Sequence, residues 1–158
     1  MLASFTQNMG LHDGQVLTLV GHSYGSTVIG YGVLAGAPAR DVVVLGSPGM
    51  GVERESDLHL PDGGHVYAER APQDPVSNLE AFGNDPSMPT FGGVRLTTND
   101  PGNPKVPVVT EHSKYFLPQS VSLDNVGRVR RAHPRADSHG AEGVRRRRYR
   151  LIIARSGL

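Results

Sequence analysis

The sequence contains neither cysteine nor tryptophan, and only 6% of its 158 residues are aromatic. Without cysteine, disulfides, thiolate catalysis and cysteine-ligated zinc are all excluded. No apolar run approaches the roughly 18 residues that a membrane-spanning helix requires. The N-terminus also lacks the basic and apolar regions of a secretory signal peptide. We therefore expect a cytoplasmic protein without a transmembrane segment.

The chain carries little net charge, +1 at pH 7, but its charges are unevenly distributed. Residues 128–158 contain ten arginines and only two acidic residues, Asp137 and Glu142. In residues 1–127, acidic residues outnumber basic ones. Such asymmetry separates an acidic body from a basic tail. We expect one domain over 1–129 and an irregular, disordered Arg-rich tail over 130–158.

Hydrophobic periodicity is lost abruptly after residue 129 and returns only at 151–154. We interpret the tail as a shifted-frame or otherwise non-native ending. The alternative is an arm that binds nucleic acid or an anionic membrane. No aromatic residue is interleaved with the run Arg145–Arg148, so we do not expect nucleic acid as a partner.

The stretch Gln15–Gly36 has the pattern of a strand, a tight turn and a helix, with the sequence GHSYG (21–25) at the turn. A serine at the apex of such a turn adopts a strained backbone conformation. The glycines two positions before and after it pass too close to tolerate side chains. This G-x-S-x-G pattern predicts a nucleophile elbow that presents Ser23 at a helix N-terminus. A phosphate-binding turn is the alternative, but its G-x-G-x-x-G and G-K-[ST] patterns are absent.

The remaining elements follow from short β-branched runs and from apolar residues at helical spacing. Parallel strands separated by helices and loops indicate an α/β fold. Strands are predicted at 16–20, 41–46, 65–69 and 94–98, helices at 2–11, 28–34 and 120–129, and short helical turns within 53–58 and 76–82.

A serine hydroxyl needs a base to take its proton and an acid to orient that base. In sheets that carry a nucleophile elbow, the acid follows a strand two positions beyond the elbow strand. Counting strands leads to Asp74, between two prolines at the carboxyl end of the 65–69 strand. Asp85 is its main rival, whereas Asp57 and Asp62 precede the required strand.

The base should follow the last strand of the sheet. His112 is the only histidine between the 94–98 strand and the basic tail, so it is the candidate base. His22 adjoins Ser23 in sequence, but successive side chains point in different directions, so we expect it to be a packing or rim residue. No H-E-x-x-H or comparable ligand cluster occurs, so no metal is expected.

Several segments in order resemble a family of actinobacterial α/β hydrolases whose function is not known. The segments are GHSYGSTVIG (21–30), VVVLGSPGMGV (42–52), VYAERAPQDPV (66–76), FGNDPSMPTFGG (82–93) and HSKYFLPQSVSLDNV (112–126). The resemblance implies Ser23 as nucleophile, Asp74 as acid and His112 as base. It also implies that strands and a glycine-containing loop, which ordinarily supplies a second oxyanion-hole N–H, are missing before the elbow, as in an N-terminally truncated fold.

These patterns predict a serine hydrolase acting on an ester or related acyl bond through an acyl-enzyme. The backbone N–H of Tyr24 should form half of the oxyanion hole, and Tyr24, Met50 and the loop 77–93 should line an acyl pocket. The expected partner is a small-molecule acyl substrate, and no cofactor is expected. The alternative is a catalytically inactive hydrolase fragment or binding module.

Overall fold

A computed structural model describes residues 1–12, 15–131 and 149–155 as parallel strands flanked by helices. In chain order the elements are α1 (Leu2–Gln7), β1 (Val16–His22), α2 (Tyr24–Leu34), β2 (Asp41–Leu45), η1 (Glu55–Leu58), β3 (Val66–Glu69), η2 (Val76–Asn78), η3 (Pro89–Phe91), β4 (Val94–Leu96), α3 (Val121–Arg131) and β5 (Tyr149–Arg155). Each predicted strand and helix is present, with ends shifted by a few residues. The short η3 turn was not predicted.

The five strands form one sheet in the order β4-β3-β2-β1-β5, and every neighbouring pair is parallel. Both β1 and β2 are buried along almost their whole length. Strands covered on both faces read as continuous apolar runs, which is how 16–20 and 41–46 appear in the sequence. The predicted α/β architecture, a mostly parallel sheet with flanking helices, is therefore confirmed.

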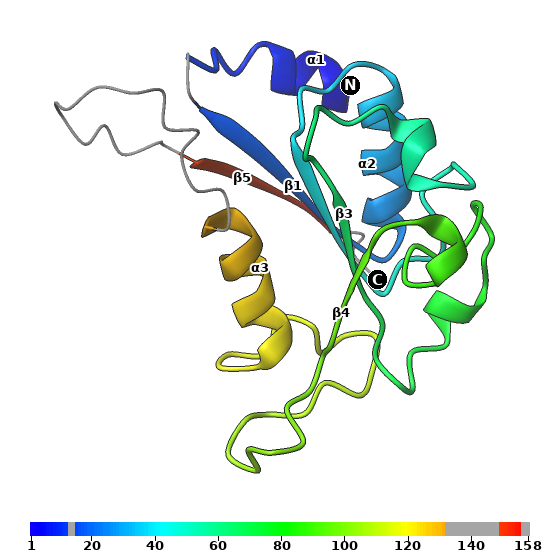
Figure 1. The fold of residues 1–158 in the computed structure, drawn as a ribbon, viewed down its shortest axis with the longest axis vertical. Coiled ribbons are helices and arrows are strands. Elements are labelled where there is room, and N and C mark those ends of the chain that lie inside the picture. Colours follow the sequence, from blue (N-terminus) through cyan, green and yellow to red (C-terminus); the bar gives the residue numbers. More distant parts are fainter. Residues whose placement is uncertain (13–14, 132–148, 156–158) are drawn as a thin grey trace, which may run out of the picture.

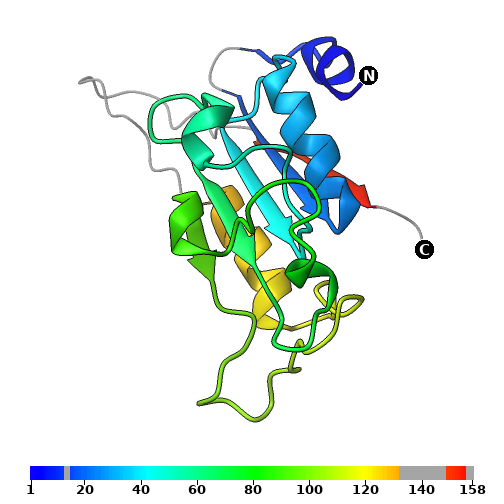
Figure 2. The ribbon, with the colours of Figure 1, turned by 90° about the vertical axis from the view of Figure 1, so that its right-hand side faces the viewer.

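Helices cover both faces of this sheet. The first two helices, α1 and α2, lie on one face, and α3 lies on the other (Figures 1 and 2). Alternate residues of the central strands divide between two apolar clusters. Leu17, Leu19, Val42 and Val44 belong to the cluster under α1 and α2, which we call the α2-side core. Val20, Val43 and Leu45 belong to the cluster under α3, the α3-side core, with Val126 and Val129 of that helix.

Two parts of the range predicted as an irregular tail, 130–131 and 149–155, have regular secondary structure, so the prediction is wrong there. Helix α3 continues to Arg131, and residues 149–155 form β5, which pairs in parallel with β1 from Val16↔Tyr149 to His22↔Arg155. The apolar run at 151–154 supplies side chains to both cores, and its backbone pairs with the edge of β1. The rest of the predicted tail, including Arg145–Arg148, lies outside the described residues.

The longest helices, α2 and α3, have 11 residues each. Within the described ranges, no helix combines the length and the apolarity needed to cross a membrane.

Candidate active site

The turn between β1 and α2 has the geometry that its sequence predicts. Ser23 adopts φ 58° and ψ −134°, a region that non-glycine residues rarely occupy. A Cβ atom on Gly21 would lie 2.7 Å from Cα of Ser26, and one on Gly25 would lie 2.3 Å from the carbonyl oxygen of Ala154. Only glycine fits at these two positions, because backbone atoms occupy the space of a side chain.

Asp74 and His112 meet at the carboxyl edge of the sheet. Both carboxylate oxygens of Asp74 lie 2.9 Å from Nδ1 of His112. Asp74 is buried in the loop after β3, and the side chain of His112 is only 15% exposed. The two residues are 38 positions apart in sequence, so the fold brings them together. This edge of a parallel sheet is where binding and catalytic groups gather.

His22 connects this pair to the turn that carries Ser23. Its Nε2–H donates a hydrogen bond of 2.7 Å to the carbonyl oxygen of His112. The two imidazole rings also lie in tilted contact, with centroids 4.7 Å apart and planes inclined by 32°. His22 is thus a packing residue, as expected, and the group on which it packs is His112.

The hydrogen bond between Ser23 and His112 is not made. Nε2 of His112 is buried and has no hydrogen-bond partner. Such bonds are often long or misaligned in a protein without substrate and shorten when the substrate binds. The structure therefore brings Asp74, His112 and the Ser23 turn together, but the hydrogen bond between Ser23 and His112 is not formed.

The environment of Asp74 keeps its carboxyl group ionised. Burial favours the neutral form and would raise the pKa of Asp74. Hydrogen bonds from His112, Tyr115 and the backbone N–H of Val76, together with the charge of the imidazole, outweigh burial and hold this pKa below its ordinary value. Tyr115 is the member of this set that the sequence analysis missed. Its position three residues after His112, within HSKYF, was the available signal.

Tyr24 is the first residue of α2, where backbone N–H groups have no partner within the helix. Its ring is half-exposed and packs edge-to-face on Phe82, with centroids 5.3 Å apart, so both aromatic rings lie beside the Ser23 turn. Met50 was expected to line the same pocket, but it is fully buried in the α2-side core. The expectation for Met50 is therefore wrong.

The rival acid, Asp85, has different partners. It forms an ion pair of 2.7 Å with Arg70 and accepts the backbone N–H of Ser87. Asp57 accepts the backbone N–H of Arg54 at the start of η1. In the part of the chain that the structure describes, no three His, Asp or Glu residues form a group that could hold a metal ion.

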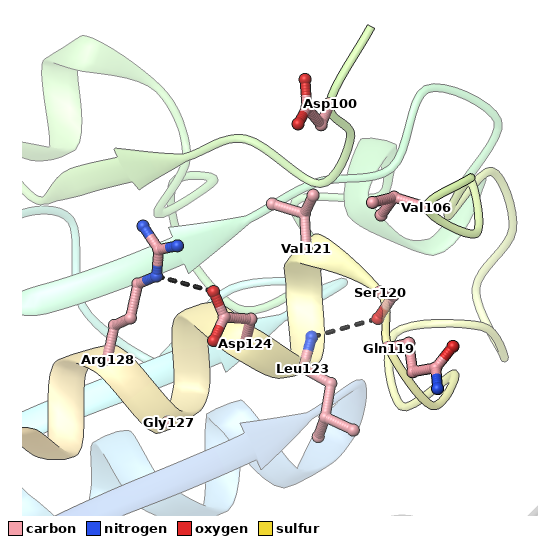
Figure 3. A pocket seen from close by; sticks show the side chains of 9 residues that line it. All are labelled: Asp100, Val106, Gln119, Ser120, Val121, Leu123, Asp124, Gly127 and Arg128. Carbon is pink, nitrogen blue, oxygen red and sulfur yellow. Dashed lines mark hydrogen bonds and ion pairs between the residues drawn. The ribbon is translucent and has the colours of Figure 1, made fainter. Parts of the chain in front are cut away.

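A cavity of about 470 Å³ lies elsewhere, at the N-terminal end of α3 (Figure 3). It is open, and its polar groups include an ion pair between Asp124 and Arg128 of 2.6 Å. Ser23, Asp74 and His112 do not line it. This cavity is therefore separate from the candidate site.

Comparison with known proteins gives relatives at the level of a family. A family model described as "Alpha/beta hydrolase" matches residues 1–84, just over half of the chain. The uncharacterized protein Rv2079 of Mycobacterium tuberculosis is 30% identical over 83% of this chain and 23% of its own length. The uncharacterized proteins Rv0963c of M. tuberculosis and Mb0988c of Mycobacterium bovis are each 40% identical over 46% of this chain and 28% of their own length.

The chain thus spans about a quarter of the length of the curated relatives that it matches. No solved structure matches it significantly. The matched range 1–84 contains the Ser23 turn and Asp74, and the parallel sheet with helices on both faces agrees with the architecture of the family. The chain belongs to the alpha/beta hydrolase family.

Proposed function

We propose that this chain is a serine hydrolase that cleaves an ester or related acyl bond through a covalent acyl-enzyme. The observation that carries the proposal is the Asp74–His112 pair, held by His22 beside the strained turn of Ser23. A buried carboxylate, an imidazole and a serine on a strand-to-helix turn are the three groups that acyl transfer by serine requires.

In this mechanism Oγ of Ser23 attacks the acyl carbon while Nε2 of His112 accepts the hydroxyl proton. His112 then returns that proton to the leaving alcohol as the acyl–oxygen bond breaks. Water, deprotonated by His112, then attacks the acyl carbon, and His112 returns this proton to Oγ of Ser23 as the acyl–Oγ bond breaks and the acid leaves. An acceptor other than water would use the same residues for acyl transfer.

The hydrogen bonding of His112 suits a general base. When the imidazole is neutral and donates its Nδ1–H to Asp74, its lone pair is on Nε2. That nitrogen has no hydrogen-bond partner and remains available for a proton. The backbone N–H of Tyr24, at the start of α2, would stabilise the negative charge on the carbonyl oxygen during attack.

The first test is labelling of the purified chain with a fluorophosphonate probe, which reacts quickly only with an activated serine. We expect labelling that is abolished in Ser23→Ala and slowed about 10²–10⁴-fold in His112→Ala. The exposed residues Ser56 and His12 provide matched controls, since Ser56→Ala and His12→Ala should leave the rate unchanged. Labelling that persists in Ser23→Ala would contradict the proposal.

The unmade contact between Ser23 and His112 favours the second candidate, a catalytically inactive binding module. A circular-dichroism melt separates the two. A parent that unfolds cooperatively but does not react with the probe would support the inactive module.

A further inference from the structure

Tyr115 contacts Asp74 in the candidate site and is fully buried. Its hydroxyl oxygen lies 2.7 Å from Oδ2 of Asp74 and 2.8 Å from the backbone nitrogen of Ala71. A buried hydroxyl that makes both bonds is fixed in position, whereas an unpaired one would cost about 1–3 kcal/mol.

The directions of these two hydrogen bonds follow from their chemistry. The backbone N–H of Ala71 can only donate, and an ionised carboxylate can only accept. The single proton of the Tyr115 hydroxyl therefore points at Asp74. Burial, together with the negative charge of Asp74, raises the pKa of Tyr115, so the hydroxyl keeps this proton.

Each oxygen of Asp74 has a donor of its own in addition to His112. Oδ1 accepts the backbone N–H of Val76 at 2.9 Å, and Oδ2 accepts the hydroxyl of Tyr115. Rotation of the carboxylate would break both bonds. A further backbone bond, from Gln73 N–H to the carbonyl oxygen of Thr110, joins the loop of Asp74 to the loop of His112 and Tyr115.

We propose that Tyr115 is a positioning residue, whose hydroxyl orients the Asp74 carboxylate toward Nδ1 of His112. The role rests on the proposed serine-hydrolase function, in which Asp74 must hold His112 in one orientation and one tautomer. Because His112 and Tyr115 are three residues apart, one loop supplies the base and also the group that fixes its acid.

The test compares Tyr115→Phe, which removes only the hydroxyl, with Tyr67→Phe, which removes a hydroxyl from a half-buried tyrosine of the same α3-side core. The readout is the pKa of Asp74, followed through the ¹³C resonance of its carboxyl carbon. We expect this pKa to rise in Tyr115→Phe, because a donor to the carboxylate is lost, and to stay unchanged in Tyr67→Phe. This measurement requires no catalysis, so it is informative even if the probe fails to label Ser23.

A second readout is the proton resonance of Nδ1–H of His112, which is slow to exchange only while Asp74 holds it. We expect this resonance to weaken in Tyr115→Phe and to remain in Tyr67→Phe. If the parent reacts with the fluorophosphonate, its labelling rate should fall about tenfold or more in Tyr115→Phe, since a hydrogen bond to a charged group is lost.

Should Tyr115→Phe fail to fold, difluorotyrosine at position 115 keeps the shape and makes the hydroxyl a stronger donor. The pKa of Asp74 should then decrease. An unchanged Asp74 pKa in the folded variant, an equal change in Tyr67→Phe, or an undiminished Nδ1–H resonance or labelling rate in Tyr115→Phe would each overturn the proposal.

Discussion

Gly46, directly after β2, lies against three residues of the candidate site. It adopts φ +57°, and a Cβ atom there would lie 2.4 Å from Oδ2 of Asp74 and 2.8 Å from the ring of Tyr115. The same atom would lie 3.0 Å from Nδ1 of His112. The missing side chain of one residue thus makes room for three others.

We expect Gly46→Ala to slow fluorophosphonate labelling at least about tenfold, because the new methyl group displaces the carboxylate by more than a hydrogen bond tolerates. Gly10→Ala is a matched control, since Gly10 has φ +59° and no neighbour within 4 Å of its Cβ position. Both variants carry the cost of a positive φ, about 1 kcal/mol. Equal labelling rates in the two variants would show that the space over Gly46 does not matter to the reaction.

At the scale of elements, β5 extends the sheet beyond β1. Ile152 packs on the α2-side core and Leu151 on the α3-side core. Ile153, the next residue, is 45% exposed. The strand therefore contributes to both cores while leaving one apolar side chain open to solvent.

This arrangement predicts unequal effects of lysine at two adjacent positions. Ile152→Lys should lower the free energy of unfolding by about 2 kcal/mol or more, because it places a charge against the apolar core. Ile153→Lys should change it by less than about 1 kcal/mol. Urea denaturation of both variants gives the comparison, and small, equal effects would mean that β5 does not pack on the sheet.

For the molecule as a whole, one buried carboxyl makes stability depend on pH. Glu69, at the end of β3, accepts a hydrogen bond of 3.2 Å from Asn125 of α3, while its second oxygen is buried without a partner. Burial raises the pKa of Glu69 to about 7, against the opposing effect of the nearby Ser122 hydroxyl and of the hydrogen bond from Asn125. Between pH 4.5 and about 7 the folded state therefore holds a proton that the unfolded state has released.

Stability should fall as pH rises through this window, because ionisation favours the unfolded chain. We expect this loss in the free energy of unfolding due to Glu69 to reach about 3 kcal/mol above pH 7, at 1.36 kcal/mol for each pKa unit. Glu69→Gln stays neutral and should not show this loss of stability. The variant should therefore be more stable than the parent at pH 8 but not near pH 4.5. The exposed Glu53→Gln is the control. Parallel pH profiles for the parent and Glu69→Gln would contradict the prediction.

Short-range patterns in the sequence were sufficient for most of the architecture. The runs at 16–20 and 41–46 predict β1 and β2 because strands buried on both faces must be apolar throughout. The turn at GHSYG is equally local at Gly21, whose Cβ position lies against the backbone of Ser26, whereas Gly25 is required by Ala154 of the distant strand β5. Strand order then led to Asp74 and His112 as candidates, and their catalytic roles stay predictions until the probe experiment is done.

Only the tertiary structure decided how distant segments meet. The sequence alone did not indicate that 149–155 would pair with β1, since an apolar run carries no information about which strand edge is open. Nor did it reveal that Tyr115 binds Asp74 from 41 residues away, or that His22 binds the carbonyl oxygen of His112 from 90 residues away. Backbone conformation and apolar patterning depend on residues that are near neighbours in the chain, so they can be predicted from the sequence. Contacts between loops depend on where parallel strands end, and that is set only when the sheet has formed.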